Sequence, residues 1–534
     1  MKEKGIGKVF LTWILAGSLM LILFTRGITL GNNRQLHPDE HVFYLGANSL
    51  VNALLHPGSD FQEYMEYPEG SYYFYGVFQL AGKVISRLAG VEHDLQLWGR
   101  IGAVFYFSAA VALGIRIMAK YLGKTRSAVS VYALTMCFSL FFLEQSRYGV
   151  GDMISLMLLM LLINLIAHGM PEGRGKLWLP AAFFVCGVMG AVKYPLLVFL
   201  ILPAGAWLHC RHLSQGRKWA GLLGQILVCV AGFLLFSPKG MMDPGYFFRV
   251  LQREGGAYVT AGTSHEAGGV LNHLTVLLVY SLVYSDFPLL LPATIRNFFW
   301  RAGETAEERH SEADFLFRCL LPGTCLLFFG YNLFARSLFF RTYTPFFGII
   351  VLYTSELAGR LLHRKGWKRV LALCLCMLMV LRGGVLVWAM SGVTSASEKV
   401  SERIVSALDS NWKETYITSL FSRASLPESA DDGTVNTSAG LGSLMNENNG
   451  ELEIRPGQLV ITGAYGYHLG LPYLLPAGEE QEAIRLWQAF REANREYLVG
   501  QAYPEWYYIL FGCWLRGGTL SQYEFPVDYS YYRK

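Results

Sequence analysis

The chain has 534 residues, of which 53% are hydrophobic and 14% aromatic, while only 16% are charged. Soluble domains carry about 25% charged residues, so water is not the solvent for most of this protein. Apolar runs recur from the N-terminus to residue 391, with lengths that suit a hydrocarbon core about 30 Å thick. The composition predicts a polytopic α-helical membrane protein, and the net charge of +5 gives no indication of nucleic-acid binding.

The first apolar run, VFLTWILAGSLMLILF, follows the basic segment MKEKGIGK and could be a signal peptide or a first helix. It lacks an obvious small-residue cleavage site and many further apolar runs follow, so we expect an uncleaved helix. The nine cysteines are scattered, eight of them in or beside apolar runs. Their spacing matches neither a disulfide framework nor a metal site.

Eleven segments are apolar and long enough to cross a membrane, the shorter ones with tilt or snorkelling flanks. They lie near residues 9–30, 98–119, 127–146, 153–168, 177–192, 195–209, 219–237, 271–293, 315–334, 339–360 and 369–390.

The segment 71–90 decides the topology, because it contains Lys83 and Arg87 and either spans the membrane or lies on its surface. With a surface helix, one side of the membrane receives the Lys/Arg-rich loops 1–8, 120–126, 172–176, 211–218, 296–309 and 360–369. A spanning helix would move the later basic loops to the outside. The positive-inside rule therefore predicts an interfacial helix, a cytoplasmic N-terminus and an extracytoplasmic C-terminus. We expect the protein to lie in the plasma membrane.

Two adjacent carboxylates, Asp39 and Glu40, follow the first span in the sequence LHPDEH. Pro38 favours an extended entry, and Asp39 suits a helix N-cap with Glu40 in the first turn. Alternatively, the two acids face a cavity on the outer side. A capping residue can serve both purposes.

Other polar residues fall at the same outer boundary. Arg147 and Asp152 share the short turn SRYGVGD, where Asp152 could simply begin the next helix. Lys193 interrupts an apolar run and either snorkels to the headgroups or holds an anionic ligand. Arg341 could contact lipid phosphates. Together these residues place acids and cations at the depth of a lipid phosphate, which suits group transfer from a lipid-phosphate carrier.

The segments LHPDEHVFY, EYPEGSYYFYG, SRYGVGD and AVKYP occur in this order within residues 1–360. The chain thereby resembles the GT-C membrane glycosyltransferases, in the branch of the protein O-mannosyltransferases and the lipid A aminoarabinose transferase. The GPI mannosyltransferases carry a similar His-Pro-Asp-Glu. Three positions depart from the family pattern: Glu69 replaces a second proline, Val150 an arginine, and Tyr194 a glycine.

The resemblance implies a hexosyl or pentosyl transferase of the cell envelope that takes a sugar from a polyprenyl-phosphate donor. The acceptor would be a glycan, lipid or protein on the outer face. It implies catalytic roles for Asp39, Glu40 and Asp152, and donor-phosphate binding by Lys193. To the phosphate site we add Arg147 and Arg341. Substrate contacts are expected from the outer-loop residues His37, Glu66, Tyr67, Tyr72 and His265.

The expected mechanism follows from charge. Asp39 accepts the proton of the incoming hydroxyl or amine, while cations stabilise the departing phosphate. A single base without a protein nucleophile implies inversion at the anomeric carbon. A divalent ion, Mg²⁺ or Mn²⁺, between Asp39 and Asp152 is compatible with the residues and is not required by them.

The remaining segments predict two outer parts. The glycine-rich loop 238–270 either closes over bound acceptor or forms an ordered surface loop. Beyond a transmembrane domain at 1–391, which includes the outer loop 32–97 with its interfacial helices, residues 392–534 predict a small extracytoplasmic α/β domain. Within it, 422–450 reads as a loop, and the segments GQLVITGA and EYLVGQA read as strands flanking a helix.

Two other functions compete with the transferase. A transporter or flippase for a lipid-linked saccharide would place ionisable groups near the membrane midplane, commonly in two related halves. A polysaccharide polymerase or ligase would use outer arginines and produce a chain. The outer position of the polar residues, and the absence of a recognisable internal repeat, favour the transferase.

Overall fold

The computed structural model describes residues 40–56, 68–146, 149–170, 175–209, 215–238, 242–245, 247–249, 251–252, 294, 315–333, 340–391, 414–418, 435–436, 448, 450–456, 458–463, 489–502 and 529–533. They fall into two compact units, a helical one that ends at Val387 and a second one from Trp388 onwards that contains the β-strands.

The helical unit begins with a packed pair, α2 (Glu40–Leu55) and α3 (Gly70–Ala89). The side of α3 that carries Tyr72, Tyr75 and Gln79 is buried, while its other side leaves Val77, Leu80, Val84 and Leu88 exposed. The helix ends at Gly90, whose φ of 67° is left-handed. A helix is therefore present where 71–90 was predicted, while its position in the membrane interface stays a prediction.

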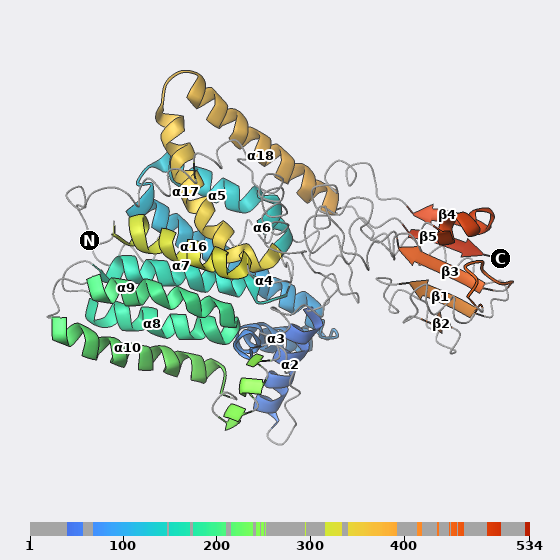
Figure 1. Cartoon of the computed structure of the whole chain (residues 1–534), viewed down its shortest axis with the longest axis horizontal. Helices are drawn as coiled ribbons and strands as arrows, with labels where there is room; N and C mark the ends of the chain where they lie inside the picture. Colours follow the sequence, from blue (N-terminus) through green and yellow to red (C-terminus); the bar gives the residue numbers. More distant parts are fainter. Residues whose placement is uncertain are drawn as a thin grey trace. The chain divides into compact units, whose positions relative to one another are not determined.

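Three long helices run beside one another next to this pair (Figure 1): α4 (Leu95–Ile117), α7 (Asp152–Gly169) and α8 (Gly175–Val192). The side chain of Asp94 caps α4 by accepting the backbone N–H of Leu97 at 2.9 Å. The far end of α4 widens into a π-helical turn, Met118–Leu122.

The next chain segment folds back along α8. A 3₁₀ helix, η2 (Tyr194–Leu200), leads into α9 (Ile201–His209), and α10 (Gln215–Phe236) then packs closely on α8. A Cβ on Gly232 of α10 would lie 2.4 Å from the carbonyl oxygen of Phe184 on α8. Small residues thus let the two helix backbones touch, as in other membrane helix pairs.

A further helical group is formed by α5 (Arg126–Phe138), α17 (Thr344–His363) and α18 (Trp367–Ser391). Their shared core contains Val131, Ala358, Leu375 and Met379. The short helix α6 (Leu140–Gln145) follows α5. The chain between α10 and α17 contributes a π-helical turn (Leu316–Leu320), α16 (Leu321–Leu333) and η5 (Phe340–Tyr343).

Four helical segments of the described chain are long and apolar enough to cross a membrane: Leu95–Leu122, Asp152–Gly169, Lys218–Phe236 and Thr344–His363. The predicted span 127–146 is instead divided at Ser139, whose extended backbone (φ −65°, ψ 129°) separates α5 from α6. The predicted spans 9–30 and 271–293 lie outside the described residues, so the total of eleven stays a prediction.

The second unit contains a five-stranded sheet in the order β2-β1-β3-β5-β4. Its strands are β1 (Glu414–Thr418), β2 (Val435–Asn436), β3 (Gln458–Gly463), β4 (Leu498–Ala502) and β5 (Tyr529–Arg533). β1 runs parallel to β2 and β3, and β5 runs antiparallel to β3 and β4. The segments GQLVITGA and EYLVGQA, which were predicted as strands, contain β3 and β4, and β5 lies between these two strands in the sheet. The two residues of β2 lie in a segment predicted as loop. The domain boundary at 391 and the outer position of this part stay predictions.

Candidate functional site

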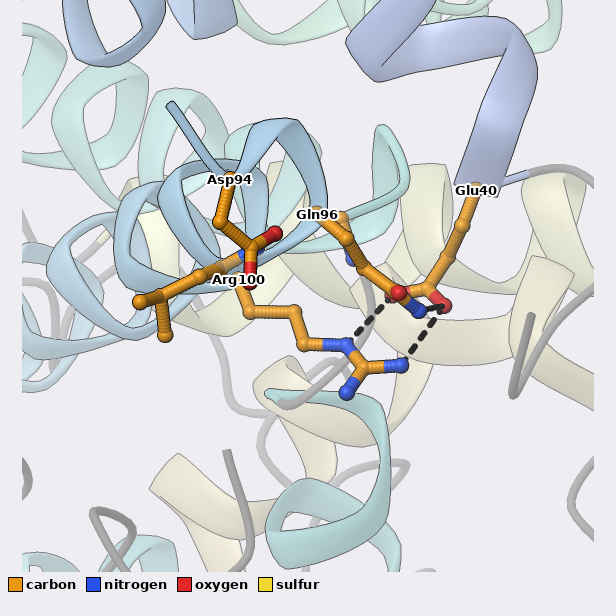
Figure 2. Close-up of polar contacts among 6 residues, drawn as sticks. Glu40, Asp94, Gln96 and Arg100 are labelled. Atoms are coloured by element: carbon orange, nitrogen blue, oxygen red, sulfur yellow. Dashed lines mark hydrogen bonds and ion pairs between the residues drawn. The ribbon is translucent and has the colours of Figure 1, made fainter. Parts of the chain in front are cut away.

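Glu40 opens α2 and is fully buried. Its carboxylate meets the guanidinium of Arg100 on α4 at two points, Nε to Oε1 and Nη2 to Oε2, each at 3.1 Å. Gln96, one turn earlier on α4, donates from Nε2 to Oε2 at 3.4 Å. Figure 2 shows both α4 side chains reaching towards the carboxylate, with Asp94 at the start of the same helix. The buried charge therefore has the paired, hydrogen-bonded partners that it requires.

The turn at residues 149–152 leads into α7 and contacts both α2 and α3. The backbone N–H of Gly149 donates to Oε1 of Glu40 at 3.0 Å. The hydroxyl of Tyr75, on α3, donates to the carbonyl oxygen of Val150 at 2.8 Å. The turn is thereby tied to residues 109 and 75 positions earlier in the chain.

The last residue of this turn, Asp152, forms an ion pair with Lys193. The ammonium nitrogen lies 2.6 Å from Oδ1 of Asp152, whose side chain is 3% exposed, while that of Lys193 is 26% exposed. Lys193 has an extended backbone (φ −157°, ψ 112°) between the end of α8 and η2, where Pro195 prevents the helix from continuing. The lysine is thus anchored by the acid and still partly open to a ligand.

Two glycines permit the close packing around this pair. A Cβ on Gly70, the first residue of α3, would lie 2.5 Å from the carbonyl oxygen of Ala191 on α8. A Cβ on Gly151 would lie 3.0 Å from Oγ of Ser71 and 3.6 Å from Cγ1 of Val192. The segments that carry Glu40, EGSYY, GVGD and AVKY therefore meet around one turn.

The electrostatics of Tyr75 also connect the two carboxylates. Burial, followed by Tyr106, Asp152 and Glu40, raises the pKa of the Tyr75 phenol well above its ordinary value. The hydroxyl therefore stays protonated and keeps donating to Val150. Because both acids contribute, Glu40 and Asp152 act within the same electrostatic environment.

Tyr72 packs between α2 and α3, and its predicted role in binding substrate stays a prediction. The side chain is fully buried, and its ring lies edge-on to Phe43 with centroids 6.4 Å apart. A Cβ on Gly46 of α2 would meet the same ring at 2.6 Å. Tyr72 therefore holds α2 against α3, as far as the described residues show.

Several predicted site residues lie outside the described residues: Asp39, His37, Glu66, Tyr67, Arg147 and His265. The backbone of Arg341 belongs to η5. Their assigned roles stay predictions. Of the remaining set, the structure brings Glu40, Asp152 and Lys193 to the two sides of the 149–152 turn.

Sequence reasoning did not identify Arg100 or Gln96. A signal existed, because Arg100 stands near the start of an apolar helix, and an arginine there needs a partner. The sequence names no partner, however, since Glu40 is 60 residues away. The backbone N–H of Gly149, which donates to Glu40, could not be identified from the sequence because every residue except proline has such a donor.

The divalent ion expected between Asp39 and Asp152 stays a prediction, because Asp39 lies outside the described residues. Among the described residues, no three His, Cys, Asp or Glu side chains converge as ligands. Asp152, one of the two predicted ligands, already holds an ammonium at 2.6 Å, and a divalent cation on the same carboxylate would meet like-charge repulsion. We therefore assign no catalytic step to a metal.

No protein-family model and no curated protein sequence matches the chain. Similar solved structures include ArnT from Cupriavidus metallidurans bound to undecaprenyl phosphate, with 13% identity over 86% of this chain and 94% of that one, and a TM-score of 0.49. AglB, an archaeal oligosaccharyltransferase from Archaeoglobus fulgidus in complex with an inhibitory peptide and a dolichol-phosphate, has 11% identity over 77% and 62%, with a TM-score of 0.45. The oligosaccharyltransferase of that organism in complex with Zn and sulfate has 12% identity over 77% and 60%, with a TM-score of 0.41. Scores below 0.5 leave the assignment of function to the residues of the chain itself.

Proposed function

We propose that this chain is an inverting membrane glycosyltransferase that moves a sugar from a polyprenyl-phosphate carrier to an acceptor on the outer face of the membrane. The observation that carries the proposal is the meeting of four motif segments around the 149–152 turn, with an acid–lysine pair on one side of the turn. Such an arrangement supplies a fixed cation at a helix end in a chain that is otherwise mostly apolar.

Lys193 is the proposed ligand for the carrier phosphate. Its ammonium has three donors, and Asp152 uses one of them. Because the Lys193 side chain is partly exposed, the other donors can reach an anionic oxygen. As the glycosidic bond breaks, charge builds on the phosphate, and a fixed ammonium stabilises that charge without rearranging.

Asp39 is the proposed general base. In the sequence it directly precedes Glu40, whose carboxylate is bound by Arg100. The acceptor hydroxyl or amine gives its proton to Asp39 while its oxygen or nitrogen attacks the anomeric carbon. The carbon–oxygen bond to the phosphate breaks on the opposite face, which inverts the configuration.

Glu40 suits a positioning role better than proton transfer. Arg100, Gln96 and Gly149 donate to its two oxygens, and the side chain is fully buried. An acid engaged in this way has little freedom to exchange a proton with substrate. We therefore propose that Glu40 fixes the start of α2, the helix that follows the proposed base in the sequence.

The test is carrier release by the purified full-length protein, supplied with a panel of polyprenyl-phosphate sugars and candidate acceptors. Wild type should release polyprenyl phosphate and give a product of inverted anomeric configuration, as read by NMR. Asp39→Asn should reduce the rate by about 10²- to 10⁴-fold, as expected for loss of a general base. The matched control is Asp94→Asn, because Asn also caps helices and should preserve α4.

Other results would reject the proposal. Equal rates for wild type and Asp39→Asn would remove Asp39 as the base. Translocation of intact lipid-linked saccharide across vesicles, without carrier release, would indicate a flippase. A product extended by many sugars would indicate a polymerase.

A further inference from the structure

A cluster of exposed basic side chains lies at the end of α4 and at the turn between α17 and α18. We call it the basic patch, and it consists of Lys120, Lys124, Arg126, Arg360, His363, Arg364, Lys365, Lys368 and Arg369. Neither of the two segments that supply it, 118–128 and 357–371, contains an Asp or Glu. The patch therefore carries a concentrated positive charge from two distant parts of the sequence.

Direct contacts hold the two segments together. Nε2 of His363 lies 2.8 Å from Oγ of Ser127, across 236 residues of sequence. Ser127 also donates to the carbonyl oxygen of Gly359 at 3.3 Å. A Cβ on Gly359 would lie 2.6 Å from the Cα of Ala128, so α5 and α17 touch backbone to backbone here. The two groups of cations are consequently neighbours.

Two helix N-termini add to this positive potential. Arg126 begins α5, and Trp367 begins α18. The amide groups at a helix start carry a partial positive charge that favours anions. Lys124 (φ 53°) and Gly366 (φ 79°) make left-handed turns just before these helices, which fixes where the helices start.

An apolar surface begins directly at the basic patch. Trp367 is 70% exposed, and Nζ of Lys368 lies 5.8 Å from the centroid of its ring. Further along α18 the exposed large side chains are Val370, Leu373, Met377, Leu378 and Leu381. Figure 1 shows α18 as one continuous helix, so the apolar surface extends away from the cations along a single element.

We propose that the basic patch binds the headgroup of an anionic phospholipid, whose acyl chains lie along the exposed face of α18. Cations select the negatively charged headgroup, and a tryptophan suits the depth at which headgroup meets hydrocarbon. A soluble polyanion would match the charge of the basic patch, but it has no acyl chains to cover the apolar surface of α18. The continuity of charge, tryptophan and apolar surface therefore favours a lipid.

This lipid site is separate from the proposed transferase site. Arg100 lies near the start of α4, whereas Lys120 lies in the π-helical turn beyond its end. Twenty helical residues separate the two by about 30 Å. The lipid site does not depend on whether the chain transfers a sugar.

The experiment is a lipid titration of the purified full-length protein in neutral detergent, followed by native mass spectrometry. Phosphatidylglycerol is compared with phosphatidylcholine of the same acyl chains, and soluble tripolyphosphate is a third probe. The test variant is Arg364→Gln/Lys365→Gln/Lys368→Gln. The matched control, Arg87→Gln/Arg455→Gln/Arg495→Gln, removes as many exposed positive charges elsewhere.

Wild type and the control variant should bind phosphatidylglycerol in preference to phosphatidylcholine. The test variant should lose about a hundredfold in affinity for phosphatidylglycerol, from about 1 kcal/mol for each lost cation. A second variant on the other segment, Lys124→Asn/Arg126→Gln, should weaken binding in the same direction. Asn is chosen at 124 because it tolerates the left-handed backbone.

Three results would overturn this site. Equal binding of the two lipids by wild type would show that charge does not select the ligand. If the test and control variants lost affinity for phosphatidylglycerol equally, the cations would act through net charge and not through a defined site. Tripolyphosphate binding as tight as phosphatidylglycerol binding would show a general anion site. If the test variant does not fold, the site is still tested by the binding of the two lipids to wild type and by the variant Lys124→Asn/Arg126→Gln.

Discussion

The guanidinium of Arg100 donates two hydrogen bonds to the carboxylate of Glu40, each 3.1 Å long, while the two side chains are 0% and 1% exposed. The pair joins α4 to the first residue of α2 and, through Gly149, to the turn before α7. The same contact therefore joins α2, α4 and the 149–152 turn.

Removing either partner should destabilise the protein strongly. Arg100→Met leaves a buried carboxylate without its cation, which costs about 3–5 kcal/mol. The double variant Glu40→Gln/Arg100→Met should lose less than the sum of the single losses, because no charge is left uncompensated. The measurement is thermal unfolding in detergent, with the exposed Arg87→Gln as control. Strictly additive losses would show that the two residues act independently.

Replacing Lys193 should weaken donor binding. Lys193→Met removes a charged donor and should raise the KM for the polyprenyl-phosphate sugar about tenfold to a hundredfold. Lys193→Arg, which keeps the charge beside Asp152, should restore part of the loss. Steady-state kinetics at varied concentrations of the polyprenyl-phosphate sugar measure this KM. An unchanged KM in Lys193→Met would place the phosphate elsewhere.

A methyl group added at Gly70 should disturb both stability and catalysis. It would approach the carbonyl oxygen of Ala191 to 2.5 Å, so the two helices must separate, at a cost of about 1–3 kcal/mol. Gly330→Ala is the control, since a Cβ at Gly330 meets nothing within 4 Å and sits in α16. That variant should gain about 0.5–1 kcal/mol from reduced chain entropy. Melting curves of the two variants should move in opposite directions.

Stability should fall in mild acid through His93. Burial, followed by the charge of Lys83, lowers the pKa of His93 below its ordinary 6.5, although Asp94 opposes the shift. Between that lowered pKa and 6.5, the unfolded chain binds a proton that the folded chain refuses, so stability is lost as the pH drops through this interval. Wild type should therefore lose more Tm than His93→Gln between about pH 7.5 and pH 5.5. Parallel Tm curves would contradict this role of His93.

Periodicity and apolar length predicted most of the helices. The helix at 71–90 and the helices starting near 153 and 177 follow directly from runs of apolar residues and their breaks. The break at Ser139 could not be predicted in this way, because no Gly or Pro marks it. An extended residue inside an apolar run is stabilised by tertiary packing, and a hydropathy average over the local sequence does not detect such packing.

The sequence allowed individual residues of the site to be predicted, but not the contacts between them. The acidic and basic residues at Glu40, Asp152 and Lys193 were identified because each is unusual in an apolar setting. Their partners were not predicted, since the Asp152–Lys193 pair spans 41 residues and the Glu40–Arg100 pair spans 60. A single sequence contains no information on such pairings. The backbone contribution of Gly149 has no chemical signature at all.

The 149–152 turn has a consequence for how the protein is made. Glu40 leaves the ribosome first, Gly149 and Asp152 follow only after α3, α4, α5 and α6, and Lys193 comes two helices later still, after α7 and α8. Until that lysine is synthesised, the nascent chain carries an acid without its partner at the start of α7. A truncated polypeptide ending before Lys193 should accordingly be an early target for quality-control proteases, whereas one ending just after α9 already holds both ion pairs.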